Sequence, residues 1–214
     1  MGTDRTRVRR APHKQVFEPE AARRILERAI IAHVAVVIDG APFSLPVACA
    51  PFNDELLLHG STASRLFKVL MDGAPACVSI TLIDALVLAR SSFESSMHYQ
   101  SLIAFGSARA LNDGEKLPAL MALTDHLFPE RRAELRPSTE KEIKATAVLA
   151  FPLTEISIKV SNGQPDDPES DLNSDVWAGI LPITSHYGLP KPAENLRTGI
   201  PIPEYISRWP KNRT

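Results

Sequence analysis

One short stretch of this sequence gathers side chains that bind anions. Ser61, Thr62 and Ser64 carry hydroxyl groups that can donate hydrogen bonds. Arg65 follows them, and its planar guanidinium group can form two parallel hydrogen bonds with a phosphate. These residue types at this spacing predict a site for a phosphate group.

The residues on both sides of this stretch indicate a strand that leads into a helix. Residues 55–58 are expected to end a buried strand, and His59 and Gly60 to form the turn after it. Ser61 or Thr62 would cap the helix, whose apolar residues follow at helical spacing. Free N–H groups and the positive end of the helix dipole would then point at one spot, which favours an anion. An ordinary capped helix with a surface arginine is the alternative, because capped helices are common.

The composition excludes several classes of protein. With 214 residues and 44% hydrophobic residues, the chain is expected to be a soluble globular protein with one full-sized domain. The formal net charge of −1 argues against a nucleic-acid partner. No apolar run approaches the length that spans a bilayer, so we expect no membrane association and a cytoplasmic location. Cys49 and Cys77 lie in apolar, strand-like runs and are expected to be reduced core thiols.

The chain divides into three parts. Residues 1–17 are basic and are expected to form a flexible arm, or one laid over a partner subunit. Residues 18–160 carry the periodic patterns of a folded domain. Residues 161–214 are rich in proline and are expected to form an extended segment packed on the domain or on a partner subunit. Its expected anchors are Trp177, Ile180, Leu181, Tyr187 and Trp209.

Hairpin turns separate most of the expected strands. Asp39 and Gly40 should join strands over 33–38 and 43–51, and Pro46 inside the second indicates a sheet edge or a bulge. Further strands are expected over 76–82, 85–90, 99–111 and 146–160 with a break near 152, and helices over 19–30 and 115–128, with a short one capped by Ser138. About six or seven strands with inserted helices predict an α+β, mainly β fold, a closed antiparallel barrel with appended helices.

Four longer segments carry a family likeness over roughly residues 20 to 185. They are I-A-H-V-A-V-V-I-D-G-A-P-F-S-L-P-V, L-L-L-H-G-S-T-A-S-R-L, D-A-L-V-L-A-R-S-S-F-E-S-S-M-H-Y-Q-S-L-I-A-F-G-S-A, and T-A-V-L-A-F-P-L-T-E-I-S-I-K-V followed by W-A-G-I-L-P. Their order resembles the FMN-binding split-barrel proteins related to pyridoxamine 5′-phosphate oxidase. The bacterial flavin-nucleotide-binding branch, which is similar to the nitroimidazole reductases, resembles the chain most. The resemblance implies a split Greek-key β-barrel over 18–160.

The resemblance also implies an FMN-binding homodimer in which each flavin lies at the subunit interface. The strand–S-R–helix motif that holds the flavin phosphate falls on Ser64 and Arg65. His59, Gly60 and Ser61 would lie along the phosphate and the ribityl chain. His59 also matches a functional histidine of the nitroimidazole reductases, so it is the candidate catalytic residue.

Other positions follow from the same resemblance. The second strand would run its backbone beside the flavin ring through Leu45, Pro46, Val47 and Ala48. Ser101 would reach the flavin from the other subunit, and Tyr99 would pack on the flavin or on the barrel. Leu66 follows the S-R pair where pyridoxamine phosphate oxidases have lysine, so we do not expect that oxidase activity. His98 and Gln100 replace the usual Asn and Arg of the third segment, which puts an anionic substrate contact there in doubt.

The resemblance implies a flavin-dependent oxidoreductase, a reductase or oxidase of a small substrate. FMN is the expected cofactor, with FAD as a substitute and a nicotinamide as the electron donor. In such proteins the cofactor carries the chemistry, and no metal-ligand spacing is present. The alternatives are a flavin storage or sensing module without turnover, and a haem or deazaflavin binder on the same fold.

Overall fold

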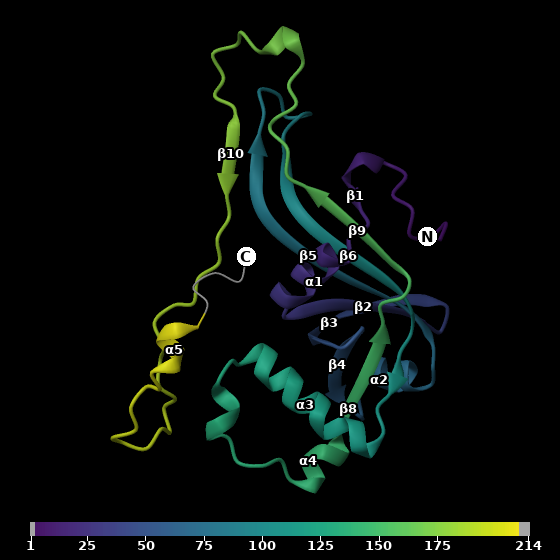
Figure 1. The fold of residues 1–214 in the computed structure, drawn as a ribbon, viewed down its shortest axis with the longest axis vertical. Coiled ribbons are helices and arrows are strands. Elements are labelled where there is room, and N and C mark those ends of the chain that lie inside the picture. The colour runs from purple at the N-terminus through teal and green to yellow at the C-terminus, as the bar shows by residue number, and fades with distance from the viewer. Residues whose placement is uncertain (1–2, 210–214) are drawn as a thin grey trace.

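A computed structural model describes residues 3–209, and within them ten strands pair antiparallel in one sheet (Figure 1). The strands are β1 (Gln15–Val16), β2 (Ile31–Ile38), β3 (Ala41–Phe52), β4 (Glu55–Ser61), β5 (Pro75–Leu88), β6 (Ser96–Ser107), β7 (Arg109–Ala110), β8 (Thr146–Pro152), β9 (Ile156–Ser161) and β10 (Gly179–Pro182). Their order is β1-β9-β6-β5-β2-β3-β4-β8-β7, with β10 also paired to β5. The order does not return to its first strand, so the barrel is split, as the family resemblance predicted, and not closed.

Helices occupy the connections and the ends of the chain. They are α1 (Pro19–Arg28), α2 (Arg65–Met71), α3 (Asp113–Leu127), α4 (Glu140–Ala145) and α5 (Tyr205–Arg208), with 3-10 turns η1 (Pro12–Lys14), η2 (Arg131–Glu134) and η3 (Glu169–Asp171). Figure 1 shows α3 and α4 together at one end of the sheet, beside β4 and β8. No helix of residues 3–209 is long and apolar enough to cross a membrane.

The first hairpin forms where the sequence predicted it. Asp39 and Gly40 both have positive φ angles, 53° and 78°, which match the turn that joins two tightly paired strands. Pro46 pairs with His33 of β2, whereas pairing of β3 with β4 begins only at Cys49. Pro46 therefore lies where β3 has a single partner, as expected for a proline in a strand.

The predicted break between 82 and 85 does not end the strand. β5 is one long strand whose pairing with β6 shifts between Ile83 and Ala85. Asp84 is the extra residue at this bulge, and its carboxylate accepts hydrogen bonds from Arg28 at 2.7 Å and Gln100 at 2.9 Å. A bulge keeps the hydrogen-bond ladder running on both sides of the irregular residue.

β4 is longer than the sequence predicted, and α2 begins later. His59 and Gly60 are strand residues and not a turn, because β8 supplies backbone partners as far as Ser61. The residue before α2 is Ser64, and its side chain makes no capping hydrogen bond. The prediction that Ser61 or Thr62 caps this helix was therefore wrong: Thr62 donates its hydroxyl hydrogen to the carbonyl of Ala145 at 3.2 Å.

Capping boxes start the two helices near β8. Asn112 accepts hydrogen bonds from the backbone of Gly114 and Glu115, and so α3 begins at Asp113, two residues before the predicted start at 115. Thr139, and not Ser138, caps α4, since its hydroxyl accepts from the Glu142 backbone while the Glu142 carboxylate accepts from the Thr139 N–H.

The buried side chains form two cores on the two faces of β4 and β8. The larger core fills the barrel and includes Val34, Cys49, Leu56, Leu58, Leu66, Phe67, Leu102, Leu149 and Phe151. The smaller core lies under α3 and includes Ala50, Leu57, Leu111, Ala119, Leu123, Val148 and Ala150. Cys49 and Cys77 are both free thiols; Cys49 lies in the core as predicted, whereas Cys77 is only partly buried.

The first and the last segments that the structure describes pack against different parts of the domain. β1 pairs with β9, and Arg5 forms an ion pair with Glu155. At the other end, Tyr205 donates a hydrogen bond to Glu134 and Trp209 donates one to the carbonyl of Pro129, both at 2.9 Å. Flexibility of the arm and its contact with a partner subunit stay predictions.

Candidate functional site

Successive residues of β4 face opposite sides of the sheet, and this alternation places the candidate residues. Leu56 and Leu58 belong to the barrel core, whereas Leu57 belongs to the smaller core under α3. A Cβ atom on Gly60 would lie 2.4 Å from the ring of Phe67, so Gly60 faces the barrel core. His59 therefore faces α3, because side chains alternate along a strand.

A cavity of about 480 Å³ opens beside His59, between the end of β4, α3 and α4. Apolar side chains of the two helices, and of Phe128 directly after α3, form much of its wall: Leu120, Leu123, Leu127, Phe128 and Ile143. Polar groups come from Ser61, Thr124, Ser138, Glu142 and Thr146. An apolar wall with a few polar groups is typical of a site for a small molecule or cofactor.

The ring of His59 has no hydrogen-bond partner among the described residues. Its Nδ1 atom is buried, which leaves a polar atom without the partner that such atoms normally have. Glu142 is the carboxylate in the same cavity wall, but Arg136 and the Thr139 N–H occupy its oxygens. Hydrogen bonds lower the pKa of Glu142 to about 2. The one from Arg136 has the largest effect, and those from the backbone and the hydroxyl of Thr139 come next. His59 and Glu142 therefore do not form an acid–base pair.

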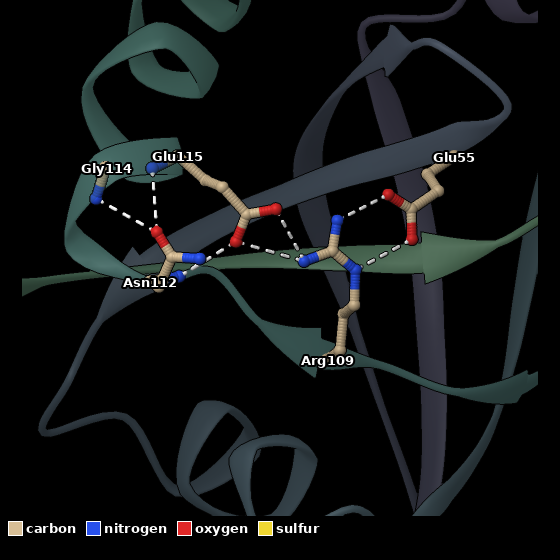
Figure 2. A network of polar contacts seen from close by, with 5 residues as sticks. All are labelled: Glu55, Arg109, Asn112, Gly114 and Glu115. Carbon is tan, nitrogen blue, oxygen red and sulfur yellow. Dashed lines mark hydrogen bonds and ion pairs between the residues drawn. The ribbon is translucent and has the colours of Figure 1, made fainter.

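A polar network fixes the start of α3 against β4 (Figure 2). Arg109 donates hydrogen bonds to Glu55 at 2.8 and 3.1 Å and to Glu115 at 2.9 Å. Asn112 caps the same helix and donates its backbone N–H to Glu115 at 3.1 Å. The Asn112 hydrogen bond, and then Arg109, lower the pKa of Glu115. This network holds α3, which forms one wall of the cavity.

Arg65 lies at the surface beside the first hairpin and not in the cavity. Its Nη2 atom donates to Oδ2 of Asp39 at 3.0 Å, and its guanidinium lies 5.5 Å from the ring centre of Phe43. The side chain is 58% exposed, so its fork is open to a ligand. α2 has only seven residues, and so the predicted phosphate site depends on Arg65 itself and on the Ser64 hydroxyl; their contact with a phosphate stays a prediction.

The structure does not gather all the predicted residues in one place. His59 and Ser61 line the cavity under α3, whereas Arg65 contacts the turn of the first hairpin. Leu66 is fully buried in the barrel core, so only its backbone could meet a ligand. Leu45, Pro46, Val47 and Ala48 are on β3; the first two are exposed and Val47 is buried.

Tyr99 and Ser101 lie on β6, which β5, β2 and β3 separate from β4 in the sheet order. The Ser101 hydroxyl lies 3.5 Å from the carbonyl of Lys159, and the ammonium of Lys159 lies 5.9 Å from the ring centre of Tyr99. The predicted contact of Ser101 with a flavin of the other subunit, and the packing of Tyr99 on a flavin, stay predictions.

The leucines of α3 were not among the predicted site residues. Leu120, Leu123 and Leu127 recur at helical spacing, a pattern that sequence reasoning attributes to core packing alone. The cavity beside these leucines exists because α4, through Ile143, forms its opposite wall, and α4 is distant from them in the sequence.

Comparisons with known proteins agree with this architecture. The chain is 41% identical to the FAD and haem binding protein of Mycobacterium smegmatis over 94% of this chain and 98% of that one, with a TM-score of 0.90. It is 35% identical to the flavocytochrome Anf3 of Azotobacter vinelandii over 96% of both chains, again with a TM-score of 0.90.

A more distant structure shares the fold alone. A candidate 5-nitroimidazole antibiotic resistance protein from Bacteroides thetaiotaomicron is 21% identical over 68% of this chain and 86% of its own, with a TM-score of 0.59. A comparison with curated proteins found no significant match. The family model described as pyridoxamine 5′-phosphate oxidase matches residues 18–160, which is more than half of the sequence. The chain therefore belongs to the pyridoxamine 5′-phosphate oxidase family of split-barrel proteins.

Proposed function

We propose that this protein binds a flavin and that the flavin is FAD. The observation that carries the proposal is the full-length match to the mycobacterial protein described as binding FAD and haem. FMN, which the sequence predicted, is the competing ligand. Extraction of the flavin from the purified protein, followed by chromatography against both standards, distinguishes them.

The surface around Arg65 fits the phosphate of either flavin. The guanidinium group is half exposed, and its competing partner, the Asp39 carboxylate, is 89% exposed. Ion pairs between exposed groups are weak, so a phosphate that offers two oxygens can displace Asp39. Ser64 adds a hydroxyl whose oxygen accepts no capping hydrogen bond from the backbone of α2.

We propose further that the protein is an oxidoreductase of a small substrate, with a nicotinamide as electron donor and the cytoplasm as its location. A bound flavin supplies hydride and electron transfer, while the protein supplies binding and orientation. Turnover of NADH or NADPH with a quinone or nitroaromatic acceptor tests this proposal. A flavin that stays oxidised with both donors would favour the storage or sensing module instead.

We propose that the active form is a homodimer. Leu86 of β5, Met97 of β6 and Leu181 of β10 are direct neighbours across three strands. Their side chains are 37%, 42% and 53% exposed, which leaves a row of apolar groups in water. A second copy of this chain would bury such a row, and obligate dimers bury large apolar interfaces.

A haem is the second group that we propose. The mycobacterial relative is described as binding haem, and the relative from Azotobacter vinelandii is described as a flavocytochrome. The apolar cavity under α3 offers the kind of wall that a porphyrin needs. The absorbance spectrum of the purified protein tests this: an intense Soret band shows haem, and flavin bands alone, or those of a deazaflavin, exclude it.

A further inference from the structure

We propose that the cavity between β4, α3 and α4 holds the haem and that His59 is the axial ligand of its iron. This inference rests on the haem part of the proposed function. Beyond that proposal, it assigns the haem to this cavity and its iron to His59.

The position of His59 supports this role. The residue pairs with Val148 of β8, in the middle of a hydrogen-bonded ladder that runs from Glu55 to Ser61. Its backbone is therefore fixed, and strand alternation directs its ring away from the barrel core and toward the cavity. A rigid backbone is what a metal ligand needs in order to be held in one geometry.

The surroundings of the ring argue against a bare metal ion at His59. The buried Nδ1 atom of His59 has no hydrogen-bond partner among the described residues, so the ring lacks the orienting group that a catalytic histidine and a metal-bound histidine both usually have. A bare metal ion needs several ligands, and residues 3–209 contain no group of three His, Cys, Asp or Glu that could hold one. Haem iron takes four ligands from the porphyrin and requires only one or two from the protein.

The cavity wall matches the remaining chemistry of a haem. The porphyrin ring is a flat apolar surface, and leucines 120, 123 and 127 lie along one face of α3. Its carboxylates are polar, and the hydroxyls of Ser61, Ser138 and Thr146 lie in the same wall. The cavity continues the smaller core, since Leu123 belongs to both.

This placement puts the haem apart from the phosphate-binding arginine. His59 faces α3, whereas Arg65 contacts Asp39 and Phe43 at the first hairpin. Variants at His59 should therefore change the binding of haem while the phosphate of the flavin keeps its contacts. Variants at Arg65 should do the reverse.

The test uses the full-length protein, stripped of bound groups and titrated with hemin and separately with FAD. We expect one haem per chain and a Soret band in the parent protein. His59→Gly should weaken hemin binding by about 10- to 100-fold, the loss seen even for residues that only support a ligand. Added imidazole should restore the parent spectrum. His59→Cys should bind hemin with a shifted Soret band, because a thiolate then replaces the imidazole.

Two other histidines serve as controls. His33→Gly makes the same change at an exposed position of β2 and should leave the hemin titration unchanged. His98 does not line the cavity, and its Nε2 atom lies 2.7 Å from the carbonyl oxygen of Gly163. His98→Ala should also keep the parent spectrum.

Three results would overturn the inference. If His59→Gly keeps the parent Soret band and affinity, another residue holds the iron and only the assignment of His59 fails. If the parent protein binds FAD but no hemin, the haem part of the proposed function fails as well. If His59→Gly instead weakens FAD but not FMN, the cavity holds the adenosine half of FAD. A titration of each variant with FMN, run beside the one with FAD, shows whether the variant is folded.

Discussion

Arg65 at the start of α2 donates a hydrogen bond to Asp39, in the turn of the first hairpin, over 3.0 Å. The two residues are far apart in the sequence, and the fold brings an exposed carboxylate to the guanidinium that we expect to bind a phosphate. Asp39 would thus compete with a bound phosphate for Arg65.

Removing this competition should tighten the binding of a phosphate-bearing flavin. Asp39→Asn keeps a residue type that tolerates the positive φ of 53° at this position. Exposed ion pairs are worth about 0–1 kcal/mol, so we expect an increase in FMN affinity of up to about fivefold. A fluorescence titration of the apo-protein measures it, and riboflavin, which lacks the phosphate, should show no change.

Loss of Arg65 should weaken the binding of the phosphate and leave the ring unaffected. A charge-assisted hydrogen bond is worth about 1.5–3 kcal/mol, so Arg65→Ala should reduce FMN affinity by about one to two orders of magnitude. Arg65→Lys should recover part of the loss, because a single ammonium cannot replace the fork. Equal loss of FMN and riboflavin would show that Arg65 holds the fold and not the phosphate.

Gly60 should not tolerate a side chain. The added methyl group of Gly60→Ala would lie 2.4 to 2.8 Å from three ring atoms of Phe67. Overpacking of a core costs about 1–3 kcal/mol in the free energy of unfolding, which denaturant titration can measure. Gly188→Ala is the matched control, since its new Cβ meets no atom within 4 Å. Phe67→Leu in the Gly60→Ala protein should restore part of the stability.

Acid should loosen the cavity wall through Glu142. Its pKa is about 2 in the folded protein, below the ordinary value of 4.5, chiefly because of Arg136. A lowered pKa stabilises the fold above about pH 4.5, and this contribution is lost as the pH falls toward 2. Glu142→Gln should therefore be less stable than the parent at pH 7, and the difference should shrink below pH 4.5. Thermal unfolding at a series of pH values gives both curves, and parallel curves would contradict this account.

A charge in the apolar row should separate the subunits of the dimer. Leu86→Asp places a carboxylate between Met97 and Leu181, where a second copy would bury it. Sedimentation should show a dimer for the parent protein and a monomer for the variant. A monomeric parent protein that still binds flavin at micromolar concentration would refute the dimer.

Much of the fold could be predicted from the sequence because it depends on neighbours in the chain. The turn at Asp39 and Gly40 needs two residues that adopt positive φ, and these residue types do so locally. The alternating and helical patterns of apolar residues likewise predicted a mainly β barrel with appended helices. The family resemblance then correctly indicated that the barrel is split.

The ends of elements could not be predicted in this way. β4 continues through His59 and Gly60 because β8, which is distant in the sequence, supplies hydrogen-bond partners there. β5 runs through its bulge for the same reason, with β6 on one side. A strand ends where its partners end, and the sequence near the strand carries little information about them.

The composition of the candidate site also depended on tertiary structure. The residue types indicated that Arg65 could bind a phosphate, and the family resemblance made His59 the catalytic candidate, but the sequence predicted no metal ligand. Only the register of β4 against β8 decided that His59 faces α3 while Gly60 faces Phe67, because a shift by one residue would exchange the two faces.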